Sequence, residues 1–199
     1  MIENPLAEKL RGHKLILASG SPRRKQFLTD MGLPFEINKK EVEEIYPEHL
    51  QGKEISEYLA KLKAEPFQDS LNVGDIVLTS DTVVWNEGES LAKAETEEEA
   101  VVMLQKLSGK WHEVITSVCL TSRKTQRVVS ETTKVKVANL SLAEILFYIA
   151  SCQPFDKAGA YGIQEWLGLI GISEIQGSYT NVVGLPTYLV YKTLMDMVG

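Results

Sequence analysis

Residues 75–85 read DIVLTSDTVVW, the most β-prone segment of the chain, and the Gly-containing turn NEGES (86–90) follows it. This pattern predicts a long buried strand that continues into a hairpin. One charge, Asp81, interrupts the apolar run. An ionised carboxylate in a central strand is costly unless it is paired, hydrogen-bonded or bound to metal. Asp81 is therefore a candidate functional residue, and the structural alternative is a strand end that meets water or a β-bulge.

Strand and helix patterns alternate on the amino-terminal side of this segment. Residues 15–19 (LILAS) predict a buried strand, after which Ser21 and Pro22 predict the start of a helix. A second helix is predicted over residues 53–65, with Lys63 near its carboxyl end. Between the two helices, residues 35–38 (FEIN) predict a further strand, and this alternation favours a fold in which helices cover a sheet.

The carboxyl-terminal half continues the alternation. The predicted elements are a helix that starts with a capping box at Thr96 and Glu99, two long strands at 112–122 and 127–140, an irregular or strand-like stretch at 159–177, and a final helix opened by Pro186. Without internal repeats or an obvious linker, this sequence predicts an α/β or α+β fold and a single domain over residues 1–199.

Composition and charge restrict the classes of partner. The chain has 44% hydrophobic and 24% charged residues and a net charge of −6. A negative protein is a poor partner for a nucleic-acid polymer, but a few cations focused in one cleft can still bind a small polyanion. No apolar run approaches the ~20 residues that span a bilayer, and residues 1–14 lack the pattern of a secretory signal. A cytoplasmic protein with no membrane partner is expected.

The segment after the first strand has the features of a phosphate site. Arg23 and Arg24 occupy the first turn of a helix, where cations oppose the helix dipole unless an anion meets them. The hydroxyls of Ser19 and Ser21 and the backbone N–H groups of the turn would complete a phosphate cradle. A solvated basic helix start is the alternative.

Other charged residues give weaker signals. Lys63, Lys93 and the acidic stretch at 41–44 are each more typical of solvated surface when taken alone. His112 has no sequence partner that suggests catalysis and is assigned a structural role. In residues 155–164 (FDKAGAYGIQ), small residues would let backbone approach a ligand closely, and Gln164 would be able to read a base edge; a tight turn is the alternative.

Five blocks of the sequence, spread over nearly the whole chain, resemble the Maf nucleoside triphosphate pyrophosphatases. The blocks are LASGSPRRKQFL (17–28), SDTVVWNEGESLAKA (80–94), KLSGKWHEVITSV (106–118), FDKAGAYGIQ (155–164) and GSYTNVVGLP (177–186). The resemblance implies one Maf-like domain with a long mixed sheet flanked by helices, and two lobes with a central cleft, related to the inosine triphosphate pyrophosphatases. It also implies hydrolysis of a nucleoside triphosphate to the monophosphate and pyrophosphate, and a homodimer.

The resemblance further implies roles for individual residues. Asp81 matches the family's proton acceptor, and Arg23, Thr82 and Gln164 match the positions associated with substrate choice in the combination of the dTTP/UTP branch. The positions that match the phosphate site are Ser19, Arg24, Glu44, Lys63 and Lys93. A divalent cation, Mg²⁺ or Mn²⁺, would bridge phosphate oxygens and the carboxylates of Asp81 and Glu44.

Two departures and two rival functions remain open at this point. The family's usual Ala-Asp-Thr is Ser80-Asp81-Thr82 here, and its usual Gly-Lys-Pro is Ala92-Lys93-Ala94, so loop geometry is in question more than chemistry. The rival functions are a purine pyrophosphatase acting on ITP or XTP, and a nucleotide-binding regulator of septum formation without turnover. Whether modified pyrimidine triphosphates are substrates is also open.

Overall fold

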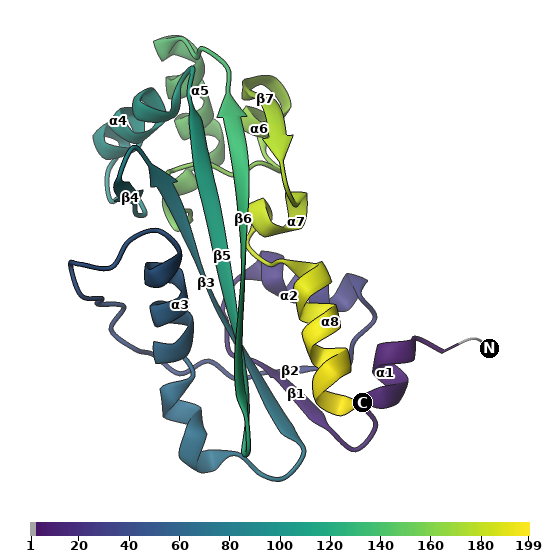
Figure 1. Cartoon of the computed structure of the whole chain (residues 1–199). Helices are drawn as coiled ribbons and strands as arrows, with labels where there is room; N and C mark the ends of the chain where they lie inside the picture. The colour runs from purple at the N-terminus through teal and green to yellow at the C-terminus, as the bar shows by residue number, and fades with distance from the viewer. Residues whose placement is uncertain (1–2) are drawn as a thin grey trace.

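A mixed seven-stranded sheet forms the centre of the computed structural model, which describes residues 3–199 (Figure 1). The strands are β1 (Lys14–Leu17), β2 (Glu36–Ile37), β3 (Asp75–Asn86), β4 (Glu89–Leu91), β5 (Trp111–Ser122), β6 (Gln126–Val137) and β7 (Ile172–Gln176). Their order is β2-β1-β3-β5-β6-β7, with β4 paired to β3. β1 is parallel to β2 and β3, and the other pairs are antiparallel. The predicted long mixed sheet is confirmed.

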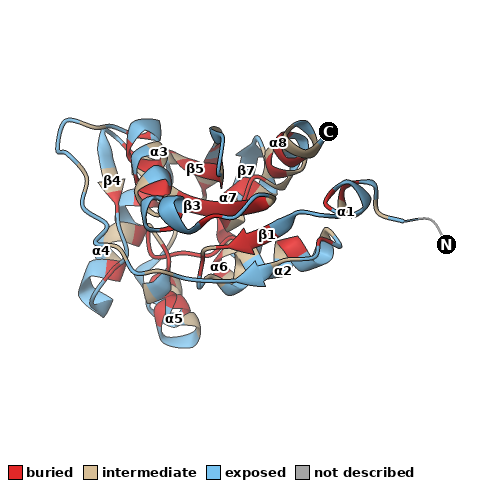
Figure 2. Ribbon diagram, turned by 90° about the horizontal axis from the view of Figure 1, so that it is seen from below, coloured by how far each residue is buried: buried red, intermediate tan, exposed pale blue. Residues whose placement is uncertain are grey.

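Helices cover both faces of this sheet. They are α1 (Pro5–Lys9), α2 (Pro22–Asp30), α3 (Lys53–Leu62), α4 (Glu97–Leu107), α5 (Leu142–Cys152), α6 (Trp166–Gly171), α7 (Tyr179–Val183) and α8 (Thr187–Val198), with short 3-10 turns η1 (Glu65–Ser70) and η2 (Pro154–Asp156). Figure 1 shows α3 on one face of the long strands and α8 on the other. The central strands between them are buried, and the helices expose their outer sides (Figure 2). Within residues 3–199, no helix is both long and apolar enough to cross a bilayer.

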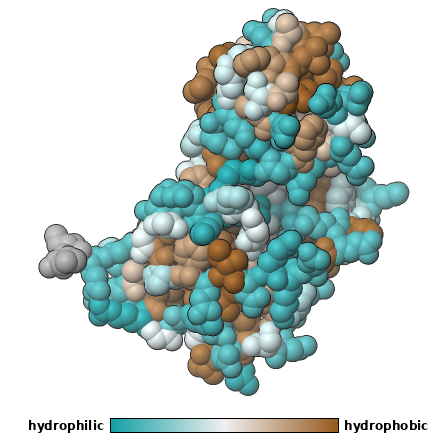
Figure 3. Space-filling model, turned by 180° about the vertical axis from the view of Figure 1, so that it is seen from behind, coloured by the Kyte–Doolittle hydropathy of each residue, from teal (hydrophilic) through white to brown (hydrophobic). Residues whose placement is uncertain are grey.

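The two largest apolar clusters of residues 3–199 lie in different parts of the molecule and define two lobes. The first lobe is built on α1, β1, α2 and α8, whose core includes Leu15, Leu28 and Leu194. The second lobe is built on β4, α4, α5 and α6, whose core includes Leu104 and Tyr148. The long strands run through both. Seen from behind, a narrowing with a mostly hydrophilic surface separates the lobes (Figure 3), which agrees with the predicted two-lobed architecture.

The middle of β3 is where the two lobes meet. All of Ile76–Trp85 pairs with β5 on one edge. On the other edge, β1 pairs with Asp75–Leu78 and β4 pairs with Val84–Asn86. Residues 79–83 therefore have no partner strand on that edge among the described residues, and we call them the open edge of β3. A strand edge without a partner strand, located between two lobes, is a natural place for a ligand.

The structure corrects two local predictions. Residues 159–177 were expected to be irregular or strand-like, yet they contain α6 as well as β7. The α6 helix has only six residues and includes Gly168 and Gly171, so it carries too little periodicity to predict. The helix at Thr96 begins as predicted, but the Glu99 side chain accepts from the N–H of Glu95 instead of closing the capping box on Thr96.

Candidate active site

Asp81 lies at the open edge of β3 and carries a buried carboxylate paired with a lysine. Its Oδ1 is 2.7 Å from Nζ of Lys63, which comes from the end of α3. The same ammonium is 2.9 Å from Oε2 of Glu44. The contact with Lys63 shows that the side chain of Asp81 points toward α3. Because alternate residues of a strand point to opposite faces, the neighbouring Thr82 points away from α3. The structural alternative of a solvated strand end is wrong, since Asp81 is buried in mid-strand.

Burial raises the pKa of Asp81 above its ordinary value, although the positive charges of Lys63 and Arg24 act in the opposite direction and Glu44 adds to the rise. A carboxylate with a raised pKa is a better proton acceptor than an ordinary aspartate once it is ionised. Lys63 keeps the ionised form accessible by compensating its charge. The pair therefore has the electrostatics of a general base held beside a cation.

Arg24 reaches the open edge from the first turn of α2. Its guanidinium donates to the carbonyl of Ser80 at 2.9 Å, to the carbonyl of Gly184 at 3.0 Å and to Oγ1 of Thr82 at 3.3 Å. It also lies 3.4 Å from the hydroxyl of Ser19. Four of its five N–H groups are thus directed at protein acceptors. Burial lowers the pKa of Arg24, while the charge of Asp81 raises it.

Thr82 is held in place by its neighbours on the face opposite Asp81. Besides Arg24, its Oγ1 contacts Oγ1 of Thr116 on β5 at 3.0 Å, and Thr116 donates to the backbone carbonyl of Asn181 in α7. Gly184, just after α7, has φ of +122° and lies against Thr82. Glycine adopts this backbone conformation without strain, so it lets the loop approach Thr82 closely.

Arg23 lies next to Arg24 but connects to the second lobe. Its Nη1 is 2.8 Å from Oδ2 of Asp156 in η2, a contact between residues 133 positions apart. Asp156 also contacts Nζ of Lys157 at 2.6 Å. Burial acts to raise the pKa of Asp156, but the hydrogen bonds from Lys157 and Arg23 outweigh it, and the pKa is lowered overall. Arg23 therefore bridges the two lobes beside the open edge.

Lys93 follows β4 and is exposed. It forms no ion pair with any residue between 3 and 199, and its backbone pairs with Ala158 in an isolated antiparallel bridge. The bridge places Lys93 beside the segment that holds Asp156. An exposed ammonium without a carboxylate partner is available to an anionic ligand.

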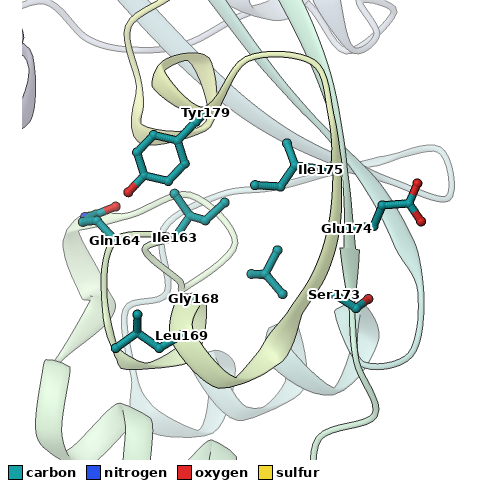
Figure 4. A pocket seen from close by; sticks show the side chains of 9 residues that line it. Ile163, Gln164, Gly168, Leu169, Ser173, Glu174, Ile175 and Tyr179 are labelled. Carbon is teal, nitrogen blue, oxygen red and sulfur yellow. The ribbon is translucent and has the colours of Figure 1, made fainter.

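Gln164 lines a cavity of about 420 Å³ between α6, β7 and α7 (Figure 4). Its wall includes the apolar residues Ile163, Leu169, Ile172 and Ile175. Figure 4 shows Gln164 and Tyr179 on one side of this cavity and Ser173 and Glu174 on the other. Gln164 itself is exposed, so its amide is accessible to a ligand.

The carboxylates of Asp81 and Glu44 fit a metal that arrives with a phosphate ligand. Both lie within 2.9 Å of the same lysine nitrogen, so their oxygens are close together. Residues 3–199 contain no group of three His, Cys, Asp or Glu side chains placed to hold a metal by themselves. Mg²⁺ is commonly held by one or two carboxylates, substrate phosphates and water. This donor set therefore suits a shared metal better than an all-protein cage.

The predicted residues fall into two groups that meet at the start of α2. Asp81, Lys63 and Glu44 form one group, and Arg24, Ser19 and Thr82 lie against the same stretch of β3. Arg23, Lys93 and Gln164 belong to or contact the segment 156–164. Sequence reasoning missed Glu165 and Tyr148, whose side chains contact each other and the segment around Gln164. The position of Glu165 directly after Gln164 was the one available signal.

Comparison with known proteins gives nearly full-length matches. Residues 14–197 match the family described as Maf-like protein. The chain is 51% identical to a dTTP/UTP pyrophosphatase of Christiangramia forsetii, covering 98% of this chain and 99% of the relative. It is 49% identical to a dTTP/UTP pyrophosphatase of Flavobacterium johnsoniae, covering 97% and 100%. A dTTP/UTP pyrophosphatase of Bacteroides fragilis is 44% identical, with coverage of 93% and 96%.

Solved structures give weaker matches. A Staphylococcus aureus Ham1 protein has a TM-score of 0.45 at 17% identity, covering 63% of this chain and 72% of that chain. A nucleoside-triphosphatase, dITP/XTP pyrophosphatase, from Mycobacterium abscessus has a TM-score of 0.39 at 16% identity, covering 64% and 74%. Both scores lie below 0.5, a level at which the likeness is too partial to support a functional argument.

Proposed function

The chain belongs to the Maf-like protein family, and from this membership and the site at β3 we propose that it hydrolyses dTTP and UTP to the nucleoside monophosphate and pyrophosphate. The relatives named for this activity match the chain over nearly its whole length. The observation that carries the proposal is the contact between Asp81 and Lys63 at the open edge of β3. The carboxylate of Asp81 would act as the base, and the adjacent ammonium of Lys63 would stabilise negative charge. Hydrolysis of a phosphoanhydride uses both functions.

Asp81 is the proposed general base. Its carboxylate accepts a proton from water, and the hydroxide formed attacks the α-phosphorus. The bond between this phosphorus and the oxygen that bridges the α and β phosphates then breaks. Pyrophosphate leaves with the electron pair of that bond. Lys63 compensates the charge of ionised Asp81, and its ammonium would also bind a phosphate oxygen. No covalent enzyme intermediate is needed.

Cations from both lobes are proposed to hold the triphosphate. Arg23 and Lys93 come from opposite lobes and both contact the segment 156–158, and Ser19 supplies a hydroxyl next to Arg24. Arg23 contacts Asp156 through Nη1, so its other N–H groups would bind a phosphate oxygen while this contact is kept. Arg24 has a different proposed role, because protein acceptors already occupy most of its donors. It shapes the phosphate site by fixing the positions of Ser80 and Thr82.

A divalent cation, Mg²⁺ or Mn²⁺, is proposed to bind between Asp81, Glu44 and the substrate phosphates. When bound, it would withdraw charge from the phosphates and make the α-phosphorus easier to attack. Asp81 and Glu44 supply the protein ligands. Lys63 holds the same two carboxylates close together before nucleotide binds.

Selectivity for pyrimidines is proposed to come from Gln164 together with Thr82 and Arg23. The amide of Gln164 offers a donor and an acceptor, which matches the donor and acceptor on the edge of uracil or thymine. A polar group left unpaired by the wrong base penalises that base. We also propose that the protein forms a homodimer. Its proposed location is the cytoplasm, where nucleoside triphosphates are made and used.

Product analysis tests this function. Purified protein is incubated with dTTP, UTP, ITP or 7-methyl-GTP and Mg²⁺ or Mn²⁺, and the products are separated by ion-exchange chromatography. We expect dTMP or UMP with pyrophosphate in equal amounts, and slower release from the other two nucleotides. Faster hydrolysis of ITP would favour the purine pyrophosphatase. Tight binding of dTTP without any product would favour the regulator.

A further inference from the structure

One segment, residues 156–165, carries or contacts three of the residues proposed to bind nucleotide. Gln164 belongs to it, Lys93 pairs with its Ala158 through the backbone, and Arg23 contacts its Asp156 at 2.8 Å. The three residues come from different elements and from both lobes. Whatever fixes the conformation of this segment therefore fixes their relative positions.

A buried lysine closes the segment on itself. Nζ of Lys157 lies 2.6 Å from Oδ1 of Asp156 and 2.7 Å from Oε1 of Glu165. The side chain of Lys157 is only 10% exposed and that of Glu165 only 21%. A buried ammonium is costly unless it is paired, so Lys157 retains both carboxylates. The contact ties residue 157 to residue 165 across the intervening loop.

Tyr148 anchors this closed segment to the core of the second lobe. Its side chain on α5 is fully buried. Its hydroxyl donates to Oε2 of Glu165 and accepts from the backbone N–H of Gly162 at 2.9 Å. A Cβ added to Gly162 would lie 2.9 Å from Nε2 of Gln164 and 2.9 Å from Cε of Lys157. The network is thus packed directly against the amide of Gln164.

We propose that Glu165 and Tyr148 are positioning residues for nucleotide selectivity. Neither needs to touch the substrate: Tyr148 fixes Glu165, Glu165 fixes Lys157, and Lys157 fixes Asp156 opposite Arg23. Selectivity requires a donor or acceptor that cannot move to suit the wrong base. The proposal rests on the proposed function of the site, but its subject is the discrimination between bases.

The test uses Tyr148→Phe, which removes the hydroxyl and keeps the ring. Dissociation constants are measured calorimetrically for α,β-imido analogues of dTTP and ITP, together with kcat and KM for dTTP and ITP. We expect the preference for the dTTP analogue to fall about fivefold, because the hydrogen bonds of the hydroxyl to Glu165 and Gly162 are lost and part of that loss reaches Gln164. The rise in KM should exceed the change in kcat. Pyrophosphate release by the wild type judges the proposed function separately.

Tyr161→Phe is the matched control. Tyr161 is also buried and lies in the same segment, but its hydroxyl contacts Nε2 of His112 at 2.7 Å and has no contact with Lys157 or Glu165. The Tyr161→Phe variant should have the same preference for dTTP over ITP as the wild type. Equal loss of preference in both variants would overturn the proposal, because any defect in the second lobe would then have the same effect.

Glu165→Gln gives an independent test if Tyr148→Phe fails to fold. It keeps the shape of the side chain, removes the charge that holds Lys157, and should lower the dTTP preference in the same way. Thermal unfolding checks that each variant is folded. A folded Glu165→Gln protein with unchanged base preference would contradict the proposal, as would a wild-type protein that binds both analogues equally.

Discussion

Nζ of Lys63 lies 2.7 Å from Oδ1 of Asp81, although the two residues belong to different elements, the end of α3 and the middle of β3. The contact occurs where β3 has no partner strand on one edge. The proposed base is therefore buried enough for its pKa to rise, yet it is adjacent to a stretch of backbone that a ligand can approach.

Replacing Asp81 with Asn should abolish most turnover while nucleotide still binds. The amide keeps the size of the side chain but accepts no proton from water. We expect kcat for dTTP to fall about 10²- to 10⁴-fold, the usual contribution of general base catalysis. Pyrophosphate release measures the rate, and calorimetry with α,β-imido-dTTP measures binding. Turnover near the wild-type rate would remove Asp81 from the role of base.

Replacing Lys63 with Met should shift the pH dependence of kcat/KM. Asp81 must be ionised to act, so activity rises as pH increases through its pKa, which burial already raises. Loss of the Lys63 charge raises that pKa further, so the acidic limb of the profile should move to higher pH. Lys61→Met is the control, since Lys61 is exposed on the same helix. A shift toward lower pH in Lys63→Met would contradict this electrostatic account.

Changing Arg24 to Gln should mainly lower stability, whereas changing Arg23 to Gln should mainly weaken nucleotide binding. Arg24→Gln leaves the carbonyls of Ser80 and Gly184 without their donor, so the free energy of unfolding should fall by about 1–3 kcal/mol. Arg23→Gln breaks a largely exposed ion pair and should cost less than about 1 kcal/mol, while it weakens nucleotide binding. Urea unfolding and calorimetry measure the two effects. A larger loss of stability in Arg23→Gln than in Arg24→Gln would contradict the structural role given to Arg24.

Sequence patterns indicated those candidate site residues whose signal depends on local burial. Asp81 was recognisable because a single charge within an apolar strand demands an explanation. The partnership of Lys63 with Asp81 was not visible, since it depends on how α3 packs across the sheet. Arg23 and Asp156 are 133 positions apart, and no local pattern relates them.

The fold also has features that local sequence predicts and features that depend on how distant segments pack. Long strands and capped helices follow from periodicity and Ser caps, as Ser21 and Ser141 illustrate. The open edge of β3 follows from where β1 ends and β4 begins, which is a property of strand order. Glu165 escaped attention because a surface glutamate and a buried partner of Lys157 look alike in sequence.

Replacing Glu44 with Gln should raise the Mg²⁺ or Mn²⁺ concentration needed for half-maximal activity. The amide is a weaker ligand for a hard divalent cation than the carboxylate. Glu43→Gln is the control, because Glu43 is an exposed neighbour whose side chain has no contact with Lys63. Removal of metal with EDTA should stop turnover in all three proteins, and added metal should restore it. Identical metal titrations for Glu44→Gln and the wild type would exclude Glu44 as a ligand.

His112 should make the stability of the fold pH-dependent. Burial lowers its pKa to about 4 from the ordinary 6.5, so between these values the unfolded chain carries a proton that the folded chain does not. Stability is therefore fully present above pH 6.5 and falls as pH decreases toward 4, by about 3 kcal/mol in total. Urea unfolding at several pH values measures this slope. His112→Gln should flatten the slope, whereas His13→Gln, at an exposed site, should leave it unchanged. If the slope persisted in His112→Gln, groups other than this buried imidazole would govern the acid sensitivity of the protein.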